Sequence, residues 1–220
     1  MSRSTSMTLL FLVVAGGRLA DGAGAGELPP QAAVVPSSLV ETAPSLAPFQ
    51  HVRFCLRYPA DCRPDLTGQG RIDLTDERSD LLDRVNHRVN AAIGPVEKSY
   101  TDSVHEGWRI APLMGDCNDY AVTKRHELLQ RGLSAKALRL AVVKTKSEGG
   151  HLVLLVATTK GDLVLDNLSD TIVPWQNTDY HWLKLQSATD PRIWHEVKVP
   201  RASPESDGKL RVVERPASKR

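Results

Sequence analysis

The sequence predicts an α+β fold, in which helices come first and an antiparallel sheet follows. Three observations support this class. Apolar residues recur with helical spacing over residues 75–93, and a second helix is expected from Asp116 to Gly132. Beyond residue 136 the pattern changes to short runs rich in Val and Leu, which turn residues separate. Helices followed by strands joined through tight turns are typical of α+β domains.

The first helix is expected to begin after Thr75, a residue type that caps helices through its side-chain oxygen. Asp76 and Glu77 then place negative charge in the first turn, where the helix dipole favours it. The apolar residues on one face of this helix are Leu81, Leu82, Val85, Val89 and Ile93. Gly94 and Pro95 follow and are expected to end the helix.

The second helix is expected to begin at Asp116 and to end at Gly132, a residue type common just past helix ends. Four strands are expected after it, at residues 137–143, 151–158, 163–166 and 180–185. Gly-containing turn segments at 147–150 and 159–162 separate the first three of them. These strands are therefore expected to form antiparallel hairpins.

The composition limits the function. Among 220 residues, 28 Lys and Arg stand against 26 Asp and Glu, so the formal net charge is only +2. A protein that neutralises a run of phosphates needs a larger basic excess. Hydrophobic residues make up 41% of the chain, and the longest apolar run, residues 7–15, is too short to span a bilayer as a helix. We therefore expect neither a nucleic-acid partner nor a membrane span.

Four segments are expected along the chain. Residues 1–25 have the layout of a signal peptide, with an early positive charge, an apolar run and then small residues; a disordered tail is the alternative. Residues 26–50 contain five prolines and no Lys or Arg, which is the composition of a linker. Residues 51–199 are expected to fold as one domain, and residues 200–220 to form a flexible tail. Export implies a periplasmic or secreted location.

Cys117 is the candidate nucleophile. It falls in the first turn of the second helix, where unpaired N–H groups and the helix dipole stabilise a thiolate. His151 opens a strand after a Gly-Gly turn, and Asp166 ends the next strand. A hairpin brings His151 and Asp166 within a residue or two of facing each other, so Asp166 could orient the imidazole toward the sulfur. The alternatives are a buried apolar cysteine, a surface histidine and an aspartate in a turn.

The segments around these residues resemble a known protein family. They read GDCNDYA from residue 115, KR at 124, GGHLVL from 149, GDLVLDN from 161 and VPW from 173. This pattern resembles the bacterial transglutaminase-like cysteine peptidases, which include the periplasmic LapG-type proteases that release adhesins from the cell surface. The resemblance implies a papain-like, transglutaminase-like core, a Cys117-His151-Asp166 triad, and a protein or peptide substrate such as a cell-surface adhesin.

The resemblance also bears on calcium. LapG-type enzymes bind calcium through acidic residues beside the cysteine, and the matching positions here are Asp116 and Asn118. An amide in place of a carboxylate removes one negative charge, so we expect at most a weak calcium site and no required cofactor. The alternative is that Asp116 only caps the helix.

The other two cysteines, Cys55 and Cys62, flank a short loop that contains a proline. No spacing for a four-ligand zinc site accompanies them, so structural zinc is not expected. In an exported protein we expect a disulfide between them, which leaves Cys117 as the free thiol. Two separate buried thiols are the alternative.

These expectations combine into one function. We expect a periplasmic thiol protease that hydrolyses peptide bonds and processes a surface or periplasmic protein, with the backbone N–H of Cys117 as a candidate oxyanion donor. A transglutaminase or a cell-wall amide hydrolase with the same triad is the alternative enzyme. A non-catalytic periplasmic binding module is the alternative of a different class. The sequence does not define the oligomeric state.

Overall fold

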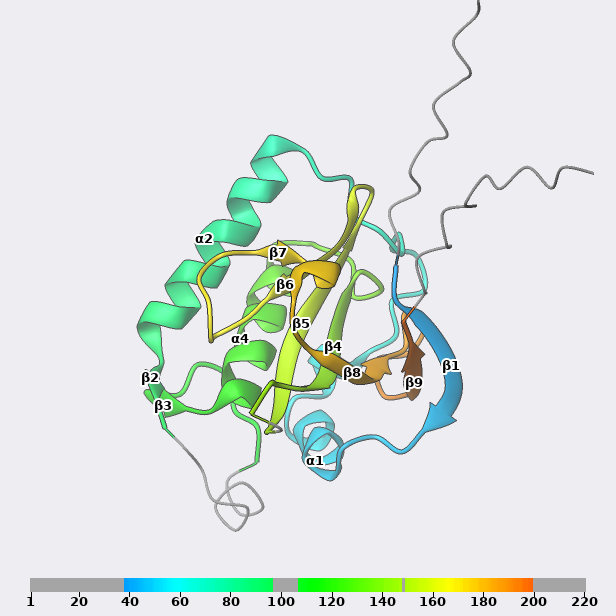
Figure 1. Cartoon of the computed structure of the whole chain (residues 1–220), viewed down its shortest axis with the longest axis horizontal. Coiled ribbons are helices and arrows are strands. Elements are labelled where there is room, and N and C mark those ends of the chain that lie inside the picture. The colour runs from blue at the N-terminus through cyan, green and yellow to red at the C-terminus, as the bar shows by residue number, and fades with distance from the viewer. Residues whose placement is uncertain (1–37, 97–106, 148, 200–220) are drawn as a thin grey trace, which may run out of the picture. The chain divides into compact units, whose positions relative to one another are not determined.

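A computed structural model describes residues 38–96, 107–147 and 149–199, and it has an antiparallel sheet at its centre (Figure 1). The sheet has seven strands in the order β1-β9-β8-β4-β5-β6-β7. Their bounds are β1 Val40–Ser45, β4 Leu138–Lys144, β5 Gly150–Thr158, β6 Gly161–Leu165, β7 Val173–Pro174, β8 His181–Gln186 and β9 Trp194–Lys198. Two short strands, β2 (Gly94–Pro95) and β3 (Met114–Gly115), pair in parallel apart from this sheet.

The described residues also contain α1 (Phe49–Arg57), α2 (Asp76–Ala92) and α4 (Cys117–Gln130). Two short 3-10 turns, η1 (Pro59–Cys62) and η2 (Trp175–Asn177), complete the elements. Helix α4 packs against β4 and β5, and α2 packs against α4. The α+β class predicted from the sequence is therefore confirmed.

Helix α2 forms as predicted. The Thr75 side chain accepts a hydrogen bond from the backbone N–H of Arg78, which satisfies one of the unpaired donors at the helix start. Leu82, Val85 and Val89 lie on the buried face, each about 1% exposed. Their spacing of three and four residues is the apolar stripe that predicted the helix.

The central strand β5 is buried on both faces, because each face has its own apolar cluster. Leu152 and Leu154 belong to the cluster that includes residues of α2 and α4. Val153 and Leu155 belong to a second cluster, together with Trp175, Trp182 and Leu185. Burial on both sides explains why β5 reads as a continuous apolar run rather than an alternating one.

The four predicted strands correspond to β4, β5, β6 and β8, with ends that differ by one or two residues. The strands β1, β7 and β9 were not predicted. β7 contains only two residues, and β1 lies in a segment whose prolines indicated a linker.

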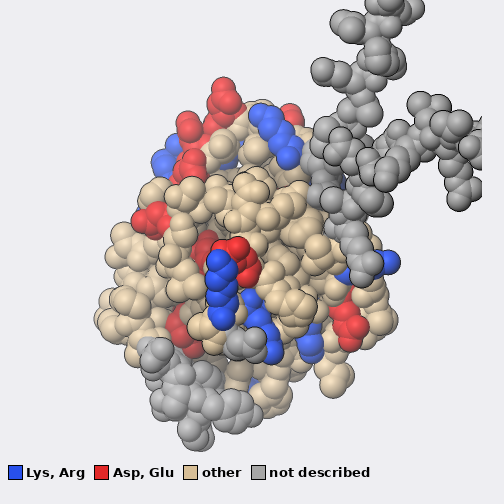
Figure 2. All heavy atoms as spheres, viewed as in Figure 1, with Lys and Arg blue, Asp and Glu red and all other residues tan. Residues whose placement is uncertain are grey.

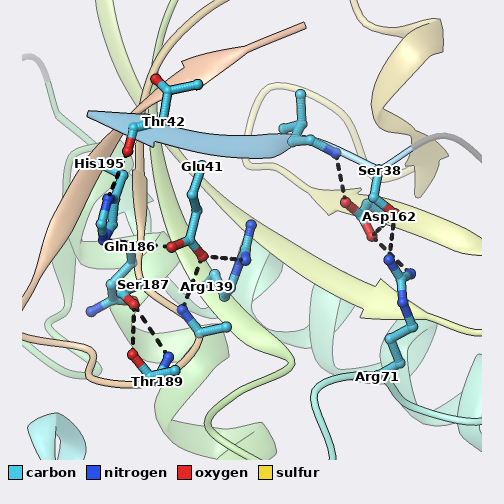
Figure 3. Close-up of polar contacts among 12 residues, drawn as sticks. Ser38, Glu41, Thr42, Arg71, Arg139, Asp162, Gln186, Ser187, Thr189 and His195 are labelled. Atoms are coloured by element: carbon cyan, nitrogen blue, oxygen red, sulfur yellow. Dashed lines mark hydrogen bonds and ion pairs between the residues drawn. The ribbon is translucent and has the colours of Figure 1, made fainter. Parts of the chain in front are cut away.

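The linker predicted over residues 26–50 is wrong for residues 40–50, because this part forms β1 and the start of α1. β1 is an edge strand that pairs with β9, and its register shifts between Glu41 and Pro44, so the missing N–H of the proline is tolerated. Figure 3 shows how Glu41 holds the strand: its Oε1 accepts hydrogen bonds from Arg139 Nη1 at 2.8 Å and from the Ala188 N–H at 3.2 Å.

Asp162 gives β1 a second attachment just before the strand begins. Its carboxylate accepts hydrogen bonds from the Leu39 N–H at 3.1 Å and from Ser38 Oγ at 3.3 Å, as Figure 3 also shows. Side chains far along the sequence thus fix a segment whose own composition does not indicate a strand.

On the face that Figure 2 shows, acidic and basic side chains are interspersed and form no large patch of one sign. None of the helices in the described part of the chain is both long and apolar enough to cross a membrane. The predicted signal peptide at 1–25 and tail at 200–220 lie outside the described residues.

Candidate active site

Cys117 is the first residue of α4, and a capping box fixes its position. The Asp116 side chain accepts hydrogen bonds from the N–H groups of Asn118 at 3.1 Å and Asp119 at 3.4 Å. Asp119 in turn accepts from the Asp116 N–H at 3.3 Å. The reciprocal pair holds the first turn of the helix, so the Cys117 side chain starts from a defined backbone.

The hairpin of β5 and β6 brings His151 and Asp166 together. Leu154 pairs with Leu165, so Asp166 lies opposite Val153, and His151 is its diagonal neighbour on the same face. His151 Nε2 lies 2.7 Å from Asp166 Oδ1, and both side chains are buried. The sequence predicted that the two residues come within a residue or two of facing each other, and the observed offset is two residues.

The imidazole of His151 bridges the aspartate and the cysteine. Its Nε2 lies 2.7 Å from Asp166 Oδ1, and Cys117 lines the same cavity as the ring. Burial alone would lower the pKa of His151. The hydrogen bonds to Asp166 and Cys117 and the negative charges of these groups outweigh burial and raise the pKa to about 9. The ring is therefore cationic at neutral pH.

Tyr180 is a further partner of Asp166 that the sequence did not reveal. Its hydroxyl donates to Asp166 Oδ2, and its ring meets the His151 ring edge to face at a centroid distance of 5.7 Å. Burial would raise the pKa of Asp166, but the hydrogen bonds from His151 and Tyr180 and the charge of His151 lower it. The carboxylate thus stays ionised with both oxygens occupied.

A cavity of about 480 Å³ opens onto Cys117 and His151. Its other lining residues are mostly apolar and include Phe49 and Trp108, with Lys184 as the basic residue among them. Gln50 also lines the cavity, and its buried Oε1 has no hydrogen-bond partner within residues 38–96, 107–147 and 149–199. A second cavity, of about 360 Å³, borders Asp166 and Tyr180. A larger one, of about 590 Å³, is lined by residues near the start of α2 and the end of α4 and contains none of the three predicted site residues.

The residues predicted for calcium do not offer a ready metal site. Calcium takes six to eight oxygen ligands. Asp116 Oδ1 already accepts two backbone N–H groups. The additional carboxylate of this turn, Asp119, is fully buried and accepts from the Arg109 N–H at 2.8 Å and from its guanidinium at 3.4 Å. The structure thus favours the capping role of Asp116 over a ligand role.

Cys55 and Cys62, which the sequence predicts to form a disulfide, lie at bonding distance from each other. Their sulfur atoms lie 2.07 Å apart, and Cys117 is the free cysteine. His51 lies against this pair, with Nε2 3.5 Å from Cys55 Sγ. These three residues form a group of potential metal ligands, but sulfurs joined to each other are not available as thiolates.

Sequence reasoning missed several residues of the site. Asp119 could have been found, because an acidic residue three positions after the cap is the capping-box spacing. No sequence pattern indicates Tyr180 and Gln50, because they reach the site from elements distant in sequence.

The fold is that of a transglutaminase-like α+β domain. The chain belongs to the family described as bacterial transglutaminase-like cysteine proteinase (BTLCP), whose sequence model matches residues 41–202. The family predicted from the sequence is thereby confirmed.

Solved structures of LapG from Legionella pneumophila are similar to this chain at 22% sequence identity. The calcium-bound structure has a TM-score of 0.45 over 49% of this chain and 64% of LapG. A second structure has a TM-score of 0.47 over 54% and 67%, and an EGTA-treated one has 0.46 over 53% and 66%. The chain thus spans about two thirds of the length of these proteins. No curated protein matches it.

Proposed function

We propose that the protein is a thiol peptidase whose catalytic triad is Cys117, His151 and Asp166. The observation that carries this proposal is the buried contact between His151 and Asp166, together with a cavity that Cys117 and His151 line side by side. Membership of a cysteine proteinase family supports peptide-bond hydrolysis over the binding-module alternative.

The geometry supports a two-step reaction. The cationic His151 favours the thiolate of Cys117, which attacks the peptide carbonyl carbon. His151 then gives its proton to the leaving amine as the C–N bond breaks, and an acyl-thioester remains on Cys117. In the second step His151 takes a proton from water, the resulting hydroxide attacks the thioester carbonyl, and the released thiolate restores the resting site.

Two features assist these steps. Asp166 holds the imidazole through Nε2, which fixes the orientation of the ring and stabilises the imidazolium. The backbone N–H of Cys117, at the first position of α4, has no acceptor within the helix and is a donor for the developing oxyanion.

The setting of the activity is also part of the proposal. We place the protein in the bacterial periplasm or outside the cell, with residues 1–25 as the export signal, an oxidised Cys55–Cys62 pair, and a surface or periplasmic protein as the substrate. An adhesin is the substrate that the LapG-type resemblance suggests. We expect no required metal, because Asn118 supplies an amide where a carboxylate would bind calcium more tightly.

The test compares wild type with Cys117→Ala on an extract of periplasmic and surface proteins. New N-termini are identified by mass spectrometry after incubation with each protein. We expect new termini only with wild type, while Cys117→Ala keeps the wild-type melting temperature. Equal cleavage by Cys117→Ala would overturn the triad. Transfer of an added amine such as dansylcadaverine, without new termini, would instead support acyl transfer.

A further inference from the structure

The cavity at the candidate active site has one charge on its wall that the reaction does not use. Lys184 lines the cavity together with Cys117 and His151. The imidazolium of His151 and the thiolate of Cys117 balance each other in the proposed resting site, so the ammonium of Lys184 remains as excess positive charge. None of the described residues that line this cavity is an aspartate or a glutamate. The cavity therefore favours a negatively charged group.

The sheet places Lys184 at this wall. Lys184 is in β8 and lies opposite Val142 of β4, which also lines the cavity. Residues opposite each other in an antiparallel pair project from the same face of a sheet. The Lys184 Nζ donates a hydrogen bond to the backbone carbonyl of Leu46 at 2.9 Å. An ammonium has three donors, so two of them are left for a bound group.

The surroundings of Lys184 leave its charge without a carboxylate partner. Glu196 of β9 lies opposite Lys184 in the register, but its side chain is exposed, and within the described part of the chain Lys184 forms no ion pair. Apolar side chains make up most of the nearby wall, and among them Phe49 is 67% exposed. Walls of low polarity strengthen the attraction between a charge in a cleft and a ligand of opposite sign.

We propose that Lys184 is a specificity-determining residue, which selects a peptide segment with an aspartate or glutamate close to the cleaved bond. The carboxylate of that residue accepts hydrogen bonds from the Lys184 ammonium, while apolar parts of the segment pack on Phe49. The inference rests on the proposed function, because it names the substrate class of the same site. Lys184 has no part in the proton transfers, so it acts on the choice of substrate.

The size of the cavity limits where the acidic residue lies. A volume of about 480 Å³ corresponds to a width of roughly 8 Å, and an extended chain advances about 3.3 Å per residue. The cavity thus holds roughly two or three residues of an extended substrate. We expect the aspartate or glutamate within this distance of the cleaved bond.

The test uses the substrate that new N-termini identify in the extract of periplasmic and surface proteins. The sequence at the cut should contain an aspartate or glutamate within about three residues of the cleaved bond. Lys184→Gln should lower kcat/KM for this substrate about threefold to fivefold, mainly through KM, because it removes one partly solvated ion pair. Lys184→Arg keeps the charge and should keep the rate.

A charge exchange between enzyme and substrate separates recognition from folding. A substrate with lysine in place of its acidic residue should be cut about tenfold more slowly by wild type, because attraction becomes repulsion. Lys184→Glu should cut the natural substrate equally slowly and should recover most of the rate with the lysine substrate. If Lys184→Glu does not fold, Lys184→Gln decides, since it should cut the two substrates at similar rates.

Lys160→Glu is the matched control, because it changes the net charge equally. Lys160 lies in the turn between β5 and β6, at the opposite end of β5 from His151. It should cut both substrates as wild type does. A cut site without an acidic residue, or a wild-type preference that persists in Lys184→Gln and Lys184→Glu, would overturn the inference while the triad stands. Absence of new N-termini with wild type would overturn the proposed function and the inference together.

Discussion

Two buried histidines in this protein lie beside cysteine sulfur, and their neighbours give them opposite charge states. His51 is 1% exposed and His151 is 7% exposed. Burial, with the positive charge of Arg125, lowers the pKa of His51 to about 4. The pKa of His151 is raised to about 9 because Asp166 and Cys117 outweigh the same cost of burial.

The comparison shows that burial alone does not create a reactive histidine. His51 accepts a hydrogen bond from Trp194 Nε1 at 3.1 Å and packs against the Cys55–Cys62 pair, so it acts as a neutral aromatic ring in the core. His151 has a carboxylate on Nε2 and lines a cavity together with the free cysteine, Cys117. The free thiol of Cys117 and the carboxylate of Asp166 therefore distinguish the surroundings of His151 from those of His51.

Replacement of each histidine by alanine should have the largest effect of the proposed changes: it should separate the expected catalytic role of His151 from the structural role of His51. His151→Ala should lower the rate of peptide cleavage by about 10³-fold or more with little change in melting temperature, because it removes the proton carrier. His51→Ala should keep the cleavage rate of its folded fraction and lose about 3 kcal/mol of unfolding free energy, because it leaves a cavity and an unpaired Trp194 N–H. Cleavage of the substrate identified from the extract and urea unfolding provide the two readouts. Loss of cleavage in folded His51→Ala would contradict the comparison.

The dependence of stability on pH should differ in sign between the two histidines. An unfolded histidine titrates near pH 6.5. Folded His51 binds its proton only near pH 4, so the unfolded state binds more protons between these values, and the free energy of unfolding falls by up to about 3 kcal/mol as the pH drops from 6.5 to 4. His151 does the reverse: its contribution is complete below pH 6.5 and is lost as the pH rises through about 9.

Urea unfolding at several pH values, for wild type, His51→Gln and His151→Gln, measures these contributions. His51→Gln should lose less stability than wild type on acidification, and His151→Gln less on alkalinisation. The same pH dependence in all three proteins would show that neither histidine is shifted.

Removal of the Cys55–Cys62 pair should lower the stability of the protein but should not change the activity at Cys117. The double variant Cys55→Ser, Cys62→Ser should lose about 2–3 kcal/mol of stability, which is roughly 5 °C in melting temperature, and should keep its peptidase activity. Alkylation of the purified mature protein should label one thiol, Cys117, before reduction and three after it. Three labelled thiols before reduction would contradict the pair and weaken the argument for export.

Calcium should have the smallest effect. Because Asn118 replaces a carboxylate and Asp119 is paired with Arg109, removal of calcium with EGTA should change the melting temperature and the cleavage rate little. A complete loss of cleavage that calcium restores would show that other ligands complete a site.

The sequence was sufficient to predict those parts of the fold that depend on residues within one helix or one hairpin. The cap at Thr75 and the stripe that includes Leu82 and Val89 predict α2, and the turn composition between β5 and β6 predicts the hairpin that joins His151 to Asp166. The sequence was insufficient for elements whose position depends on contacts with residues far away along the chain. β1 depends on Arg139 and Asp162 for its attachment, and no local pattern indicates those contacts.

The same holds for the polar partners of the site. Tyr180 acquires its role from Asp166, which it reaches through tertiary packing. His51 was not singled out from the sequence, because the helix α1 that holds it was not predicted and its burial depends on the fold. Spacing along the chain and the family resemblance predicted Cys117, His151 and Asp166 as site residues, whereas the charges around them needed the three-dimensional structure.

The most direct test of the account is an NMR titration of the imidazole nitrogens of His151 and His51 in the same sample. The account predicts a pKa of about 9 for His151 and about 4 for His51. In Asp166→Asn the His151 value should fall toward or below the ordinary 6.5, while the His51 value should not change. A His151 that titrates near 6.5 in wild type, with no response to Asp166→Asn, would contradict the thiolate–imidazolium site.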